Sequence, residues 1–264
     1  AKDKFPKGIA VENRTGSGGT VGMSYGQNAK ADGYTVTNIA VELVTLPNAG
    51  TGGDVYYDKW TPIMSPNYSC SVITVRADSP YQTLDDLLKA SKEKDLQAGN
   101  SGVGAIWHLA NVALEQAADT KFVHVPFEGG APMITSLLGG HIDFISCSYA
   151  EVYPHVQSGD FRVLAALNDT RMEEAPDIPT AKELGYDVSI GAWRGLGVPK
   201  DTPDEVVKYL EDAFMEAAKS EKFTEFMNNA MYPIVIKNSE EFGKQIAAEN
   251  TMYKELIEKM DLAN

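Results

Sequence analysis

The sequence predicts an α/β protein with mostly parallel sheets. Short runs of β-branched and aromatic residues alternate with segments of helical periodicity, an alternation typical of layered α/β folds. Several helical segments begin with residue pairs that cap helices. The chain has 264 residues, which is enough for two domains of ordinary size. We therefore expect α/β layers divided between two domains.

Nine short apolar runs are expected to form strands. Each is rich in β-branched or aromatic residues and is bounded by turn-forming residues. They span residues 9–13, 34–38, 72–76, 96–99, 122–125, 142–146, 163–167, 196–199 and 232–236.

Helix starts are expected between these strands. A threonine followed three residues later by a carboxylate matches the capping-box spacing. The pattern occurs three times, at Thr83 with Asp86, Thr180 with Glu183, and Thr202 with Glu205. Proline at 203 suits the first helical position, where its missing N–H has no intrahelical partner to lose. A last helix should open at Ser239.

Two turn-rich stretches, 78–80 and 197–203, are the expected crossing points between the domains. If the chain crosses at both, its outer segments form one domain and its middle forms the other. This predicts a first domain of residues 1–77 plus 196–264 and a second domain of residues 78–195.

Composition excludes several classes of partner. Lys+Arg number 23 against Asp+Glu 37, so the net charge is −14. Nucleic acids and anionic membrane surfaces attract basic patches, so neither is an expected partner. No apolar run approaches the ~20 residues of a membrane-spanning helix. The two cysteines, Cys70 and Cys147, lie in strand-like runs, and buried free thiols are favoured over a disulfide.

Two glycine-rich loops, 16–22 and 99–104, each follow an expected strand and precede an expected helix. Converging N–H groups and a helix N-terminus would suit a carboxylate without any lysine or arginine. Each loop could equally be a tight turn without a ligand. Val21 interrupts a dinucleotide-binding motif in the first loop, and Val103 interrupts a nucleophile elbow around Ser101 in the second.

The four histidines form no metal-binding pair, so no metal site is expected. His108 falls near the start of the helix after the second loop. It could orient that loop by hydrogen bonding or reach a ligand, although simple packing is the favoured interpretation.

Several motifs together resemble one family. Residues 11–19, Val-Glu-Asn-Arg-Thr-Gly-Ser-Gly-Gly, are similar to the signature of the tripartite tricarboxylate transporter receptors, also called the TctC or Bug family. Further stretches agree in order and spacing. They are residues 32–35, 102–110, 124–127, 139–143, 154–159 and 193–196.

The resemblance implies a two-domain periplasmic-binding-protein fold (type II-like) with two crossing strands and a ligand cleft between the domains. It implies a monomeric periplasmic or extracytoplasmic receptor that closes over a small carboxylate and delivers it to integral membrane permease subunits. Neither a cofactor nor catalysis is expected. The family normally begins with a strand, a loop and a helix that precede the 11–19 motif. We therefore expect a longer native protein with its signal peptide removed, and weak ligand binding by this chain.

The resemblance also assigns ligand-binding positions. The family's second carboxylate loop maps onto Asn100, Ser101, Gly102, Gly104 and Ala105, where threonine is usual at position 105. The remaining candidates are Ser17, Gly18, Glu42, Thr45, His108, Ser146, Cys147, Ser148 and Arg194.

Two of these candidates, Glu42 and Arg194, carry open alternatives. Glu42 would repel an anionic ligand, could pair with an amino group of a zwitterion, or could face solvent, which is favoured. Ser146 and Ser148 could donate to the ligand. Arg194 could bind a carboxylate with two hydrogen bonds or form an interdomain salt bridge, whereas Trp193 is expected to pack at the hinge.

Two rival functions remain. The first is a nucleotide-dependent oxidoreductase using the 16–22 loop, which requires an acidic residue at the end of a second strand. Asp32 is near the required spacing but precedes its strand. The second is the effector-binding half of a transcription regulator, for which no helix-turn-helix is evident.

Overall fold

The computed structural model describes residues 4–258, which divide into two compact units. Of these residues, unit 1 holds 4–68, 193–230 and 234–258, and unit 2 holds 69–192 and 231–233. The units therefore divide at different residues from those expected. Two long strands, β2 (Trp60–Arg76) and β7 (Gly191–Pro199), run from one unit into the other, and the chain enters unit 2 once more at residues 231–233.

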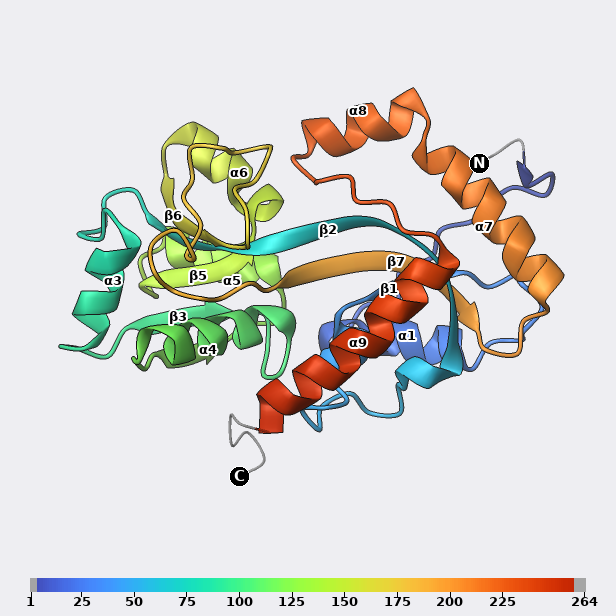
Figure 1. Cartoon of the computed structure of the whole chain (residues 1–264), viewed down its shortest axis with the longest axis horizontal. Coiled ribbons are helices and arrows are strands. Elements are labelled where there is room, and N and C mark those ends of the chain that lie inside the picture. The colour runs from blue at the N-terminus through green and yellow to red at the C-terminus, as the bar shows by residue number, and fades with distance from the viewer. Residues whose placement is uncertain (1–3, 259–264) are drawn as a thin grey trace. The chain divides into compact units, whose positions relative to one another are not determined.

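Unit 1 contains one further strand and most of the C-terminal helices (Figure 1). Its elements in chain order are η2 (Ser17–Gly19), α1 (Thr20–Gln27), β1 (Thr37–Ala40), α2 (Glu42–Thr45), η3 (Tyr57–Lys59), α7 (Asp204–Ala218), α8 (Glu221–Asn229) and α9 (Ser239–Glu258). Strand β1 pairs antiparallel with β7, in the register Thr37 opposite Gly197 to Ala40 opposite Arg194.

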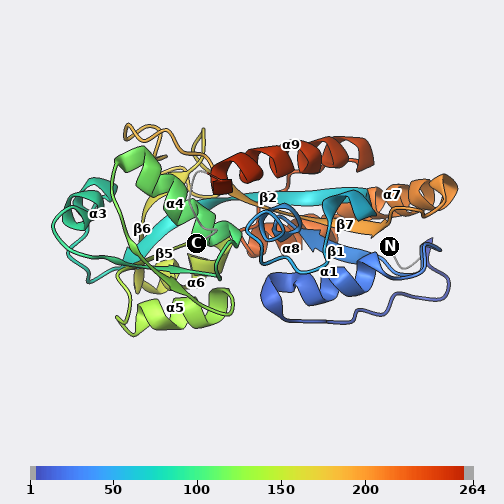
Figure 2. The same ribbon diagram turned by 90° about the horizontal axis from the view of Figure 1, so that it is seen from below.

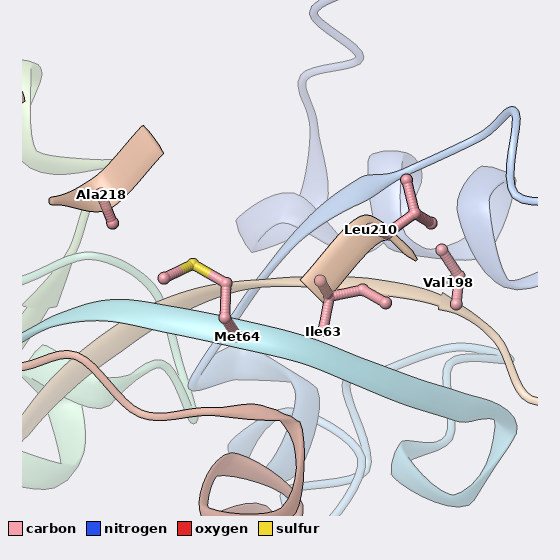
Figure 3. Close-up of a cluster of buried hydrophobic side chains, with 5 residues drawn as sticks. All are labelled: Ile63, Met64, Val198, Leu210 and Ala218. Atoms are coloured by element: carbon pink, nitrogen blue, oxygen red, sulfur yellow. The ribbon is translucent and has the colours of Figure 1, made fainter. Parts of the chain in front are cut away.

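The core of unit 1 includes a cluster that joins both long strands to α7. Figure 3 shows its five buried side chains. They are Ile63 and Met64 on β2, Val198 on β7, and Leu210 and Ala218 on α7. The apolar face of α7 meets the strands here, as the helical periodicity of its sequence predicts.

Unit 2 alternates strands and helices. Its elements are α3 (Leu84–Ser91), β3 (Gln97–Asn100), α4 (Ile106–Ala118), β4 (Val123–Pro126), α5 (Gly130–Leu138), β5 (Phe144–Ser148), α6 (Tyr149–Ser158) and β6 (Phe161–Leu167). Helices α4 and α5 both contact β3 and β5, and Figure 2 shows them on opposite faces of these strands. The α/β class predicted from the sequence is confirmed.

The sheet is mixed, which corrects the expectation of mostly parallel strands. Strand β3 pairs parallel with β4 and β5, whereas β2 pairs antiparallel with β5 and β6. Strand β2 enters unit 2 in the direction opposite to its neighbours. Parallel pairing is therefore confined to strands that are connected through helices.

Two expected strands are absent from the described residues. Residues 9–13 form no strand and lie exposed, with Val11 87% accessible, because no neighbouring strand pairs with them. Residues 232–236 are also irregular, and only an isolated bridge between Ser65 and Lys237 follows them. A β-branched run forms a strand only where a partner strand accepts its hydrogen bonds.

The helix starts were predicted with mixed success. The reciprocal capping box of Thr83 and Asp86 begins α3 as expected. Thr180 and Glu183 make the same reciprocal hydrogen bonds, but they close a turn and no helix follows. Thr202 donates its hydroxyl to the Pro199 carbonyl, and α7 begins instead with Asp204.

The last helix begins at Ser239 as predicted, although its capping hydrogen bonds come from the residue before it. Asn238 Oδ1 accepts from the Glu241 N–H at 2.9 Å, and Glu241 Oε2 accepts from the Asn238 N–H at 3.1 Å. Within residues 4–258, no helix has both the length and the apolar character that crossing a bilayer requires.

Candidate functional site

The carboxyl ends of the parallel strands β3, β4 and β5 meet at one edge of the unit 2 sheet. The register places Ala98 opposite Phe144 and Gly99 opposite Ile145, so β3 and β5 run side by side towards this edge. Ligands of open α/β sheets bind outside the carboxyl ends of such strands. The 99–104 glycine loop leaves the sheet here and leads into α4.

Asn100 is the last residue of β3 and is fully buried. Its Oδ1 accepts from the Gly102 N–H at 3.0 Å, and its carbonyl accepts from the Phe127 N–H at 2.9 Å. The first of these bonds sets the orientation of the side-chain amide. The Asn100 Nδ2 group has no hydrogen-bond partner among the described residues. A buried amide donor without an acceptor is costly, so this group calls for an acceptor from outside the protein.

The N–H groups of the loop divide into two sets. Gly102 donates to Asn100, Gly104 donates to His108 Nδ1 at 3.1 Å, and Ala105 donates to the Gly102 carbonyl at 3.1 Å. Within residues 4–258, the N–H groups of Ser101 and Val103 have no acceptor. Gly102 and Gly104 have φ angles of 119° and 78°, a region that favours glycine, so these residues permit the turn.

His108 makes a hydrogen bond to the loop, one of the possibilities that the sequence left open. It is buried, accepts the Gly104 N–H, and packs edge-on against His124 with ring centroids 4.6 Å apart. Burial, assisted by the nearby His124, lowers the pKa of His108 to about 4. The imidazole is therefore neutral at pH 7.

The two serines of β5 use their hydroxyl protons within the protein in this structure. Ser146 Oγ donates to the Trp107 carbonyl at 2.6 Å, and Ser148 Oγ donates to Glu151 Oε2 at 2.6 Å. Each hydroxyl has only one proton to donate.

Sequence reasoning missed Ser71. This serine lies opposite Ser148 in the β2–β5 register, is fully buried, and has a hydroxyl without a partner among the described residues. No sequence signal marked it, because it lies within a 17-residue strand whose pairing was not foreseen.

Both cysteines are free and buried, as expected. Burial raises the pKa of the Cys147 thiol well above its usual value, and the Glu151 carboxylate adds to the effect. Burial also raises the pKa of Cys70 to about 12. Because thiolates are the reactive form, neither thiol is a nucleophile at neutral pH. Cys147 lies between Ser146 and Ser148 on the strand, so it faces the opposite side of the sheet.

The remaining candidates belong to unit 1. Ser17 and Gly18 are exposed and have positive φ angles of 45° and 61° in the turn before α1. Thr45 on α2 is fully buried, and its hydroxyl has no partner among the described residues. The first loop and α2 are neighbours, since a Cβ added at Gly18 would approach Leu46 Cδ1 to 3.0 Å.

Glu42 and Arg194 are both half-buried in unit 1. Glu42 opens α2, and its charge is the smallest of four causes that raise the pKa of Tyr253, of which burial is the largest. Arg194 lies on β7 opposite Ala40, and its carbonyl accepts from Ser65 Oγ at 2.9 Å.

Trp193 is fully buried in unit 1 and anchors the start of β7 to α9. Its indole Nε1 donates to Glu249 Oε2 at 2.6 Å, and its ring packs edge-on against Phe242 at a centroid distance of 4.9 Å. Gln245 Nε2 donates to the other oxygen of Glu249 at 2.7 Å. Burial raises the pKa of Glu249, although these two hydrogen bonds oppose the shift.

Removing the Glu249 charge should change how stability depends on pH. The pKa of Glu249 is raised in the folded state. The stability that its carboxyl contributes to the fold is therefore fully present below the ordinary pKa of 4.5 and is lost as pH rises through the raised pKa. We expect wild type to lose stability relative to Glu249→Gln between about pH 4 and pH 8. Urea unfolding at both pH values measures this.

Glu240→Gln is the matched control for that experiment. Glu240 is exposed on the same helix, and its hydrogen bond with Lys244 lowers its pKa. The stability that Glu240 contributes is therefore present above the pKa of the unfolded state. Wild type should gain a little stability relative to Glu240→Gln as pH rises, which is the opposite sign. A Glu249→Gln difference that stays constant with pH would contradict the prediction.

A groove in unit 1 lies beside the first glycine loop, because Thr15, Gly19 and Gly22 contribute to its lining. It has a volume of about 860 Å³ in unit 1 and is lined by the 4–15 segment, β1 and α7. Phe5, Val36, Leu210 and Phe214 contribute apolar walls. Among the described residues, no group of three or more histidine, cysteine or acidic side chains could hold a metal ion.

Two compact α/β units that share two long strands are the architecture of solute-binding proteins of the periplasmic type. Residues 1–262 match the family model described as the tripartite tricarboxylate transporter family receptor, TctC. The chain belongs to this family of solute-binding receptors.

Solved structures agree with this assignment. A TctC solute-binding protein from Polaromonas is 38% identical, with a TM-score of 0.78 over 97% of this chain and 89% of that one. The periplasmic binding protein BugD is 27% identical, with a TM-score of 0.86 over 96% and 86% of the two chains. MatC from Rhodopseudomonas palustris with bound malate is 20% identical, with a TM-score of 0.86 over 97% and 91%, and shares the fold.

The oxidoreductase alternative is not supported. The segment before the 16–22 loop forms no strand, so the strand–loop–helix context of a dinucleotide site is missing from the described residues. The family match instead indicates a receptor.

Proposed function

We propose that this protein captures a small organic carboxylate at the Asn100–Ala105 loop and delivers it, outside the cytoplasm, to the integral membrane subunits of a tripartite transporter. The observation that carries the proposal is the buried Asn100 Nδ2 donor without a partner. It lies in the same loop as the free N–H groups of Ser101 and Val103.

The chemistry of this loop matches a carboxylate. A carboxylate only accepts hydrogen bonds, and the loop offers three donors together with the Ser101 hydroxyl. The loop also leads into the N-terminus of α4, a helix of 13 residues, where the helix dipole favours negative charge. No cation is needed, because hydrogen bonds to a charged acceptor are each worth roughly 1.5–3 kcal/mol.

The overall charge supports short-range recognition. A net charge of −14 repels anions at long range, but salt screens this repulsion beyond about 8 Å at physiological ionic strength. Affinity must therefore come from donors that touch the ligand. The malate bound by MatC is a small dicarboxylate of the class proposed here.

For unit 1, we propose that Ser17, Gly18 and Thr45 can also donate hydrogen bonds to a carboxylate. The buried Thr45 hydroxyl without a partner is the best supported of these. We further propose that the protein acts as a monomer and needs no cofactor, because its donors are all groups of the chain itself.

A ligand panel tests the function. Malate, adipate, an aromatic acid and an amino acid should be compared by thermal shift and calorimetry with their neutral amides and with NAD. We expect one carboxylate class to raise the melting temperature and its amide to have no effect. Equal binding of acid and amide, or stabilisation by NAD alone, would contradict the proposal.

A further inference from the structure

We propose that His108 is the positioning residue of the ligand loop and that, as the neutral Nε2–H tautomer, it decides which N–H groups of the loop are left for the ligand. This inference rests on the proposed function for its consequence, but its geometry can be tested without any ligand.

The hydrogen bond itself assigns the tautomer. The Gly104 N–H can donate only to an unprotonated nitrogen, so Nδ1 carries a lone pair and the proton of the neutral ring lies on Nε2. Both partners are buried, so water cannot replace the acceptor.

The charged and titratable groups near His108 lie on α4, on β4 and in the segment that connects them. Glu115 lies on the same helix, α4, and is buried; its Oε1 contacts His124 Nε2 at 3.2 Å. His124 on β4 packs edge-on against the His108 ring. Lys121, between α4 and β4, approaches Glu115 to 4.0 Å. Glu115 favours a charged His108, but burial and His124 outweigh it and lower the pKa to about 4.

The consequence for the site is specific. Because the Gly104 N–H donates to His108, it is already paired within the protein. The N–H groups of Ser101 and Val103 are left without acceptors. If His108 lost its acceptor, the buried Gly104 N–H would have to find another partner, and the loop would change conformation.

Two variants of His108 distinguish the effect of losing the Nδ1 acceptor from the effect of losing the volume of the ring. In His108→Asn the side-chain oxygen can occupy the position of Nδ1, whereas in His108→Gln the terminal amide reaches the position of Nε2. We expect the malate affinity of His108→Asn to stay within about threefold of wild type. That of His108→Gln should fall by about tenfold, because the loop must change conformation to pair the Gly104 N–H. Equal losses in both variants would overturn the proposal.

A ligand-free measurement keeps the test independent of the proposed function. In the ¹⁵N spectrum of wild type at pH 7, His108 should show the neutral Nε2–H tautomer. The Gly104 amide should be protected from hydrogen exchange in wild type and His108→Asn, and less protected in His108→Gln. A proton on Nδ1, or an unprotected Gly104 amide in wild type, would overturn the inference. If the spectra agree and no carboxylate of the ligand panel binds, the proposed function fails while the positioning role stands.

Discussion

The substitution Asn100→Asp is expected to weaken carboxylate binding by at least about a hundredfold, since one lost hydrogen bond to a charged acceptor and a new like charge each act against the complex. Aspartate has the same shape as asparagine, and one of its oxygens can still accept the Gly102 N–H. The other oxygen replaces the Nδ2 donor that has no partner within the described protein. Isothermal titration with malate measures the effect.

The design separates binding from folding. Asn100→Ala should lose the Gly102 hydrogen bond as well as the donor, yet it adds no charge. We therefore expect its affinity to fall less than that of Asn100→Asp, by roughly ten- to a hundredfold. Circular dichroism confirms that both variants are folded. If Asn100→Asp bound malate as tightly as wild type, Asn100 would be removed from the site.

Trp193→Ala should lower the free energy of unfolding by about 3–5 kcal/mol, the usual cost of deleting a buried tryptophan side chain. Trp193 is fully buried, packs against Phe242, and donates to the partly buried Glu249. Its removal leaves a cavity and takes one hydrogen bond from the carboxylate. Urea unfolding followed by circular dichroism measures the loss.

Two further variants apportion this effect. Trp193→Phe keeps a six-membered ring against Phe242 but removes the N–H donor and the five-membered ring, so it should lower the free energy of unfolding by about 1–3 kcal/mol. The double variant Trp193→Phe/Glu249→Gln should lower the free energy of unfolding by less than the sum of the two single changes, because both changes act on one hydrogen bond. A loss below about 1 kcal/mol for Trp193→Ala would show that the contact contributes little to stability.

Local patterns predicted the elements that local interactions stabilise. The strand, loop and helix around 96–118 were found because an apolar run, three glycines and a helical periodicity follow one another in sequence. The Thr83 capping box was found for the same reason, since its hydrogen bonds span three residues. The prediction of a strand at residues 9–13 was wrong, because a run of β-branched residues carries no information about whether another strand pairs with it.

The sequence indicated the candidate loop but not the hydrogen bonds that its groups make. The glycine loop and His108 were recognised in the sequence, yet Gly104 was assigned to the ligand although its N–H belongs to His108. Likewise, the Ser146 hydroxyl was offered to the ligand although a carbonyl 39 residues earlier accepts its proton. Such competition between partners depends on distances that sequence spacing does not contain.

By itself the sequence determined the α/β class, the family motifs, the buried free thiols and the loop that contains Asn100. These follow from composition, periodicity and motif order, which are properties of neighbouring residues. Only the tertiary structure decided the antiparallel direction of β2, the partners of Ser146 and Ser148, and the donors that remain free at the loop. The physical reason is that hydrogen bonds in the interior are exclusive, and folding brings distant residues together to compete for each donor and acceptor.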